Sequence, residues 1–488
     1  MDYLLAVDIG TTSAKCLAMS ADGNVISSRQ SFYTTTFSQD GFAEQDPELI
    51  YKGVVEIISS SVIPSSRCLG ISFSSAMHSL TAVDCDGNLL LPLIIWSDLR
   101  SKKQFYELER KGLIGKLCAI TGTPVHPMTP LCKLLWLKEH QPEIFRTAHK
   151  FISIKEFIFY RLTGIFVVDY SIASATGIFD IEKLKWSDEA LNLLSLSSDK
   201  FSTPVPVTEK ISLIESKAGE LGLDQNIPII VGASDGCLAQ LGSDAMNKGD
   251  LTITLGTSGA VRIASSQRLI DPEGKIFNYL LHKGEYICGG PTNSGTAIVD
   301  WFAKNFHSPE KNIQKLSEEV ESIPAGSDGL IMLPYLLGER APIYDPDARG
   351  TFFGVSVGHT SLHFQKAMLE GICFELNWIM ESLEMFVGKS DRIFVSGGIT
   401  HAPKWVQMLS DVLGRELILS DSQDASSLGA AIIGLESLGI ELRTHHDHTK
   451  IFYPNTANHK IYASLFPIFK RLYSQTNSLL KDLNKITE

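Results

Sequence analysis

The chain opens with three short runs whose hydrophobic pattern is typical of strands. Residues 4–9 are apolar, and residues 13–19 and 25–33 follow after short polar segments. Short apolar runs bounded by turn residues indicate buried strands. We therefore predict an antiparallel meander whose first turn, at residues 10–13, has the polar composition of a phosphate-binding loop.

A helix and further strands are predicted after the meander. Asp46 is a good N-cap residue and Pro47 suits the first helical position, so we expect a helix from there to about residue 60. Residues 68–74 and 227–231 have the apolar character of strands, and residues 102–226 are rich in helical patterns. Strands that alternate with helices predict an α/β fold.

A similar pattern recurs in the second half of the chain. Residues 250–255 predict a strand, residues 256–259 a polar turn and residues 260–264 another strand, which echoes the first strands of the chain. Further on, residues 392–395 predict a strand, and residues 427–434 begin a helix of small residues. The echo indicates an internal duplication. We therefore predict two domains, residues 1–245 and 246–488.

The composition narrows the class of protein. The 488 residues are 44% hydrophobic and 20% charged, which suits a globular chain with two cores. The formal net charge of −12 argues against binding to nucleic acid or to an anionic membrane. The eight cysteines show no C-x-x-C spacing, so we predict neither a zinc site nor a disulfide framework. We find no signal-peptide pattern and no apolar run of about 18 residues, so the expected location is the cytoplasm.

Two polar loops carry the candidate phosphate chemistry. A glycine after a strand allows a tight turn, and the backbone N–H groups and hydroxyls that follow it can point at phosphate oxygens. Either loop alone is compatible with an ordinary hairpin, but two such loops can hold a triphosphate from two sides. The candidate ATP-binding residues in these loops are Gly10, Thr11, Thr12, Ser13, Gly256 and Thr257.

Two carboxylates and a glycine pair complete a candidate phosphoryl-transfer site. Asp8, at the end of the first strand, can hold magnesium through a water molecule, because Mg²⁺ keeps most of its waters. Asp235 lies between glycines after a strand, where a carboxylate can accept the proton of an attacking hydroxyl. Gly397 and Gly398 leave a flat backbone against which an adenine can pack. Asp-Gly and Gly-Gly pairs are also common in ordinary turns, and the chain has no Walker or G-x-G-x-x-G motif.

These residues, in this order, resemble the FGGY family of carbohydrate kinases, within the actin-like superfamily. Residues 128–140 contain the P-x-x-K-x-x-W pattern of the family as Pro130, Lys133 and Trp136, and residues 350–370 fit its second signature. The resemblance covers residues 3–440. It implies two ribonuclease-H-like domains with a deep interdomain cleft, ATP and Mg²⁺ as cofactors, and a sugar acid or polyol as the substrate.

The resemblance also assigns residues to the substrate. It implies that Met77, His78, Trp96 and Asp98 line the sugar site and that Asp235 is the catalytic base. Residues 74–79, 121–128 and 168–174 are similar to those of family members that phosphorylate D-gluconate, whereas Ala76 occupies a position where xylulose kinases usually have Gln. We therefore expect phosphorylation of D-gluconate to 6-phospho-D-gluconate, with a pentulose or polyol kinase as the alternative.

A gluconate carboxylate calls for a cation, and the sequence does not choose among several. The candidates are His78, Arg100, His126, Lys155 and Arg340. Each of them also suits a structural role.

A non-catalytic, actin-like nucleotide-binding protein is a remote alternative, which the presence of both loops and of Asp235 disfavours. A homodimer is compatible with the family, but no feature of the chain requires one.

Overall fold

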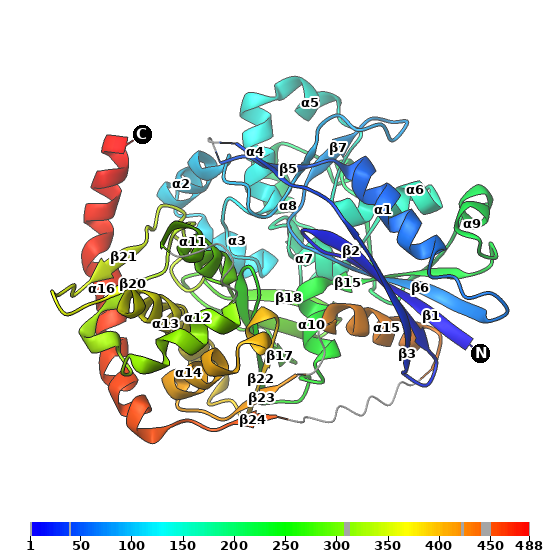
Figure 1. The fold of residues 1–488 in the computed structure, drawn as a ribbon. Coiled ribbons are helices and arrows are strands. Elements are labelled where there is room, and N and C mark those ends of the chain that lie inside the picture. The colour runs from blue at the N-terminus through cyan, green and yellow to red at the C-terminus, as the bar shows by residue number, and fades with distance from the viewer. Residues whose placement is uncertain (1, 39–40, 307–312, 421–423, 441–449, 488) are drawn as a thin grey trace. The chain divides into compact units, whose positions relative to one another are not determined.

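The computed structural model describes residues 2–38, 41–306, 313–420, 424–440 and 450–487, and Figure 1 shows their elements. The described residues form two compact units. The first contains residues 2–38, 41–244, 265–288 and 424–440, and the second contains residues 245–264, 289–306, 313–420 and 450–487. Within the described residues, no helix is long and apolar enough to cross a membrane.

The first unit is built on a six-stranded sheet in the order β14-β15-β6-β1-β2-β3. Its antiparallel meander β1-β2-β3 confirms the first three predicted strands, and β1 also pairs in parallel with β6. The strands of this sheet are β1 (Asp2–Ile9), β2 (Ser13–Ser20), β3 (Val25–Phe32), β6 (Arg67–Ser75), β14 (Lys210–Ser212) and β15 (Pro228–Ser234).

Two helices far apart in the sequence pack near this sheet. Helix α1 (Pro47–Ser59) begins at the predicted N-cap, where the Asp46 side chain accepts a hydrogen bond from Glu48 N. It buries Ile50, Val54 and Ile57 in a core shared with β1. Helix α15 (Ala425–Ser437) lies against β1 and β6 although it comes near the end of the chain (Figure 1).

The rest of the first unit is a helix-rich part with a second hydrophobic core. Its helices are α2 (Lys102–Arg110), α3 (Ile114–Thr121), α4 (Pro130–His140), α5 (Pro142–Thr147), α6 (Ile154–Thr163), α7 (Tyr170–Ser174), α8 (Asp188–Leu194), α9 (Glu215–Leu221) and α10 (Asp235–Gly242). Its strands are β4 (Thr36–Phe37), β5 (Ala43–Gln45), β7 (Thr81–Val83), β8 (Leu93–Ile94), β9 (Lys150–Ile152), β10 (Val167–Asp169), β11 (Phe179–Asp180), β12 (Lys185–Trp186), β13 (Thr203–Val205) and β18 (Phe277–His282).

The sheet of the second unit repeats the arrangement of the first. Its strands run in the order β19-β17-β16-β22-β23-β24, with β16 antiparallel to β17 and parallel to β22. The first sheet places β1 between β2 and β6 in the same way, which supports an internal duplication. The strands are β16 (Asp250–Leu255), β17 (Gly259–Ser265), β19 (Glu285–Thr292), β22 (Arg392–Ser396), β23 (Leu417–Leu419) and β24 (Ile451–Phe452). The other elements are β20 (Ile331–Leu333), β21 (Thr351–Phe353), α11 (Thr296–Phe306), α12 (Ile313–Glu319), α13 (Ser361–Val387), α14 (Pro403–Leu413) and α16 (Thr456–Thr487).

The packing units differ from a simple division of the chain at residue 245. Residues 265–288 and 424–440 belong to the first unit although they follow that position. Residues 424–440 belong to the first unit because α15 packs closely against β1. A Cβ at Gly434 would lie only 2.9 Å from Leu4 Cδ1. The division into domains 1–245 and 246–488, and a cleft between them, stay predictions.

Candidate active site

The first predicted phosphate loop is a tight turn between β1 and β2. Gly10 N donates to Ser13 O at 3.0 Å, which closes the turn. Two side chains brace it from outside: Gln45 Nε2 donates to Thr11 O at 2.6 Å, and Trp96 Nε1 donates to Thr11 Oγ1 at 2.9 Å. Thr12 is exposed at the tip of the loop. The loop is therefore held in one conformation while its tip stays accessible to a ligand.

Asp8 lies directly before this loop and has an unusual environment. Its side chain is partly buried, and its buried Oδ1 accepts no hydrogen bond within the described part of the chain. Burial raises the pKa of the Asp8 carboxyl, while Ser74 and Lys15 act in the opposite direction. Lys15 is the cross-strand neighbour of Asp8 and forms an ion pair with Asp424. A buried carboxylate oxygen without a donor suits a water molecule on a magnesium ion.

The second loop, between β16 and β17, resembles the first but is one residue shorter, since Leu255 pairs with Gly259 whereas Ile9 pairs with Ala14. Gly256 N donates to Ser258 O at 2.9 Å, and Thr257 is exposed. The start of α11 covers the loop closely, because Thr296 N donates to Gly256 O at 2.7 Å. This loop therefore has the same combination of a fixed backbone and an exposed threonine.

The glycine pair after β22 touches the strand that enters the second loop. Gly397 has a φ of 86°, and a Cβ there would lie 2.7 Å from Leu255 O. A side chain is therefore excluded at Gly397 by both its backbone conformation and its neighbour. Gly398 has ordinary space, with the nearest atom 3.7 Å from a built Cβ.

Asp235 is the first residue of α10 and follows the end of β15. Gly232 has a φ of 69°, and a Cβ there would overlap Phe73 O at 1.8 Å. The pairing of β15 with β6 shifts register between Ile230 and Ala233, so this glycine redirects the end of the strand. Asp235 is partly exposed, and its Oδ1 accepts a hydrogen bond from Gly236 N at 2.6 Å. Its position at a strand end gives the carboxylate access to a ligand.

His78 adopts a left-handed backbone conformation with a φ of 66°. Its Nδ1 lies 2.8 Å from Ala175 O, so this nitrogen carries the proton, and its Nε2 lies 3.2 Å from the Tyr279 hydroxyl. Both ring nitrogens therefore have partners inside the protein. Met77 is partly buried against the second core, and Trp96 is half-buried.

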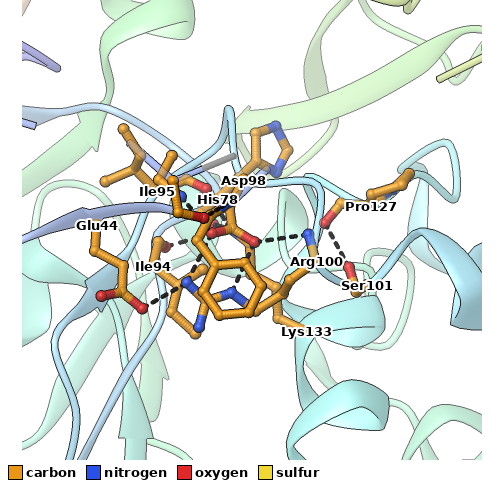
Figure 2. Close-up of polar contacts among 12 residues, drawn as sticks. Glu44, His78, Ile94, Ile95, Asp98, Arg100, Ser101, Pro127 and Lys133 are labelled. Carbon is orange, nitrogen blue, oxygen red and sulfur yellow. Dashed lines mark hydrogen bonds and ion pairs between the residues drawn. The ribbon is translucent and has the colours of Figure 1, made fainter. Parts of the chain in front are cut away.

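Asp98 is fully buried and heavily bonded. Its Oδ2 accepts from Ala43 N at 2.6 Å and from Arg100 Nη2 at 2.8 Å. Its Oδ1 accepts from the backbone N and the Nε of Arg100, at 3.0 and 2.9 Å. A carboxylate has about four acceptor positions, and all four are occupied here. Figure 2 shows this cluster together with Glu44, which also bonds to Arg100.

Comparison with known proteins shows to which protein family the chain belongs. A model of the N-terminal domain of the FGGY family of carbohydrate kinases matches residues 3–242, and a model of its C-terminal domain matches residues 251–437. The chain belongs to the FGGY family of carbohydrate kinases. The family resemblance drawn from the sequence is thereby confirmed, as is the mixed α/β, two-domain kinase fold of the actin-like type.

Several FGGY kinases are similar to this one over nearly their whole length. A gluconokinase of Bacillus subtilis is 37% identical, over 96% of this chain and 95% of its own. A xylulose kinase of the same organism is 31% identical, over 99% of this chain and 98% of its own. The crystal structure of a gluconate kinase from Lactobacillus acidophilus superposes with a TM-score of 0.93 at 32% identity, covering 99% of each chain.

The candidate cations of this FGGY kinase already have partners inside the protein. Lys155 is buried and forms an ion pair with Asp169 at 2.7 Å, and burial lowers its pKa. Arg100 binds Asp98, and His126 Nδ1 accepts from Met128 N at 3.2 Å. Arg340 lies in the second unit, where its Nη2 donates to Thr292 O at 2.8 Å. Contact of any of these with a substrate carboxylate stays a prediction.

The structure groups the predicted residues by unit. The first unit holds Asp8, Gly10, Thr11, Thr12, Ser13, Met77, His78, Trp96, Asp98 and Asp235, and the second holds Gly256, Thr257, Gly397 and Gly398. Among the described residues of this kinase, no group of three or more His, Cys, Asp or Glu side chains is arranged to hold a metal.

Three bracing residues of the site had no predicted role. They are Gln45, which holds the first loop, Tyr279, which contacts the His78 ring, and Lys133, which contacts the His78 backbone. Only Lys133 had a signal in the sequence, since it is the lysine of the P-x-x-K-x-x-W pattern.

Proposed function

We propose that this FGGY kinase transfers the γ-phosphate of ATP to D-gluconate and releases 6-phospho-D-gluconate and ADP. The observation that carries the choice of substrate is the identity of 37% to a gluconokinase, against 31% to a xylulose kinase of the same organism. The stretches around His78 and His126 favour the same substrate.

The nucleotide is assigned to the glycine-rich turns. The exposed tips of the two loops, at Thr12 and Thr257, would contact its phosphates, and Gly397 and Gly398 would support the adenine. The buried oxygen of Asp8 would hold a magnesium-bound water. When bound, Mg²⁺ neutralises the charge that develops on the β- and γ-phosphates.

Asp235 is assigned the role of catalytic base. Its carboxylate would accept the proton of the 6-hydroxyl of gluconate while that oxygen forms its bond to the γ-phosphorus and the bond to ADP breaks. Met77, His78, Trp96 and Asp98 would surround the substrate. For Asp98 to accept a substrate hydroxyl, one of its present donors has to give way, because its acceptor positions are all occupied.

Two alternatives stand beside this proposal. A pentulose or polyol kinase would share the fold and differ only in the sugar contacts, and the xylulose kinase similarity supports it. A non-catalytic nucleotide-binding protein is disfavoured by the accessible Asp235 carboxylate. We also propose that the protein is located in the cytoplasm, and a homodimer is compatible with the proposed function.

A coupled assay of ADP release tests the substrate. Purified protein with Mg-ATP is measured against D-gluconate, D-xylulose, L-ribulose, glycerol and no sugar. Turnover with gluconate well above the others, with the phosphate found on C6 by NMR, is the expected result. Preferred turnover of a pentulose would overturn the choice of gluconate, and no turnover with any sugar would favour the non-catalytic alternative.

A further inference from the structure

Lys133 is a buried lysine at the first turn of α4, close to the predicted sugar residues. Its helix begins at Pro130 and is capped by the Thr129 side chain, which accepts a hydrogen bond from Cys132 N. The Lys133 side chain is fully buried, although lysine is among the residues least often found inside proteins. A lysine in such a place needs partners for its ammonium group.

Those partners are three backbone carbonyls from two separate segments. Nζ donates to His78 O at 2.6 Å, to Ile95 O at 2.8 Å and to Ile94 O at 3.3 Å. The ammonium form of lysine has three N–H donors and the neutral amine has two, so the three carbonyls can accept from every donor in either form. Figure 2 shows the lysine among these carbonyls.

The two segments are the ones that carry the predicted substrate residues. His78 O belongs to the turn with Met77, and the carbonyls of Ile94 and Ile95 directly precede Trp96. The His78 backbone is left-handed, a conformation that is unfavourable for a residue other than glycine and must be held by its surroundings. The Lys133 hydrogen bond to His78 O is one of the contacts that hold it.

A second residue of the same helix supports the same region. The ring of Trp136, one turn after Lys133, lies 5.1 Å from the guanidinium carbon of Arg100. That guanidinium binds Asp98. Both the lysine and the tryptophan of the P-x-x-K-x-x-W pattern therefore act on the residues that surround the substrate.

We propose that Lys133 is a positioning residue that fixes the turn at His78 and the segment at Trp96 relative to each other, and thereby shapes the sugar site. The inference rests on the proposed function for the identity of the sugar. Lys133 would not touch the substrate. Its removal would let the two segments separate, so it should weaken sugar binding much more than nucleotide binding.

The test compares Lys133→Met with wild type. Methionine has a similar length and no donors, so it removes the three hydrogen bonds without leaving a large cavity. The sugar KM is expected to rise at least tenfold while the KM for ATP stays within twofold. The sugar used is the member of the substrate panel that the wild type phosphorylates best. If gluconate is the wrong substrate, the wild-type assay shows it, whereas the Lys133 proposal is tested only by comparing the variant with wild type.

Two further variants keep the test decisive. Lys133→Gln retains a shorter donor and should show a smaller rise in sugar KM, which is the order expected for positioning. Lys366→Met is the matched control, since Lys366 is another buried lysine that donates to a carbonyl, that of Ile323. It should leave the sugar KM unchanged. A wild-type sugar KM in Lys133→Met, equal losses for sugar and ATP, or unfolding of both Lys133 variants would overturn the proposal.

Discussion

The indole Nε1 of Trp96 donates a hydrogen bond of 2.9 Å to the hydroxyl of Thr11. A residue assigned to the sugar is thus bonded to a residue assigned to the phosphates, and both lie in the first unit. Because Gln45 Nε2 donates to Thr11 O as well, the loop is held through both its backbone and its side chain. Removal of the Trp96 donor itself should therefore loosen the loop at Thr11.

Trp96→Phe tests this link. The change keeps an aromatic ring and removes the donor, so the loss should be close to one hydrogen bond, about 1 kcal/mol, or roughly a fivefold rise in the KM for ATP. A double-mutant cycle with Thr11→Val isolates the bond, because the two changes share it. A coupling energy near zero in that cycle would show that the hydrogen bond does not matter for nucleotide binding.

Asp235→Asn should abolish most of the turnover while the protein still binds sugar. The amide keeps the size of the side chain but cannot accept the proton, and a general base typically contributes about 10²–10⁴-fold. We expect kcat to fall by that factor with a nearly unchanged sugar KM, measured by ADP release. Asp224→Asn, an equivalent change at an exposed aspartate of the same unit, is the control. Near-wild-type kcat in Asp235→Asn would exclude it as the base.

Several elements could be predicted because the signal for each is local. The strand at residues 250–255 matches β16, and the cap at Asp46 begins α1, since apolar runs and capping residues act over a few positions. The turn at Gly10 could be predicted for the same reason. The packing of α15 against β1 brings together residues far apart in the sequence, and no local pattern encodes it.

The residues that brace the candidate site were harder to predict for the same reason. Lys133 resembles an ordinary helix lysine until the fold surrounds it with carbonyls from two other segments. The four donors to Asp98 come from Ala43 and Arg100, of which only Arg100 is near in the sequence. The motifs therefore identify the family, whereas the partners of each side chain depend on the tertiary structure.

The burial of Lys133 predicts a pH dependence of stability. Burial lowers the pKa of Lys133 to about 7, an effect that Asp98 opposes and Arg100 reinforces, while the unfolded chain has a value near 10.5. Between these values the unfolded chain binds the additional proton, so stability should rise with pH across this window and fall as pH decreases toward 7. At most, the unfolding equilibrium changes by about tenfold per pH unit.

This dependence can be isolated by subtracting a variant that lacks the amine. Denaturant unfolding of wild type and Lys133→Met is compared at pH 7, 8 and 9, following a probe in the first unit. Wild type should gain stability relative to the variant as the pH rises. A difference that stays constant over this range would show that the lysine keeps its ordinary pKa in the folded protein.

Gly397→Ala and Gly398→Ala form a matched pair next to the second loop. Alanine at 397 would have a φ of 86° and a Cβ 2.7 Å from Leu255 O, whereas at 398 the nearest atom is 3.7 Å away. The first change should destabilise the fold by roughly 1–3 kcal/mol, the usual cost of such strain. The second should change stability by less than about 1 kcal/mol and raise the KM for ATP, because its methyl group would stand where the adenine is proposed to pack. Thermal unfolding and ATP titration of both variants separate the two effects. Equal stability of the two variants would contradict the strain at Gly397, and an unchanged KM in Gly398→Ala would remove that glycine from the proposed adenine site.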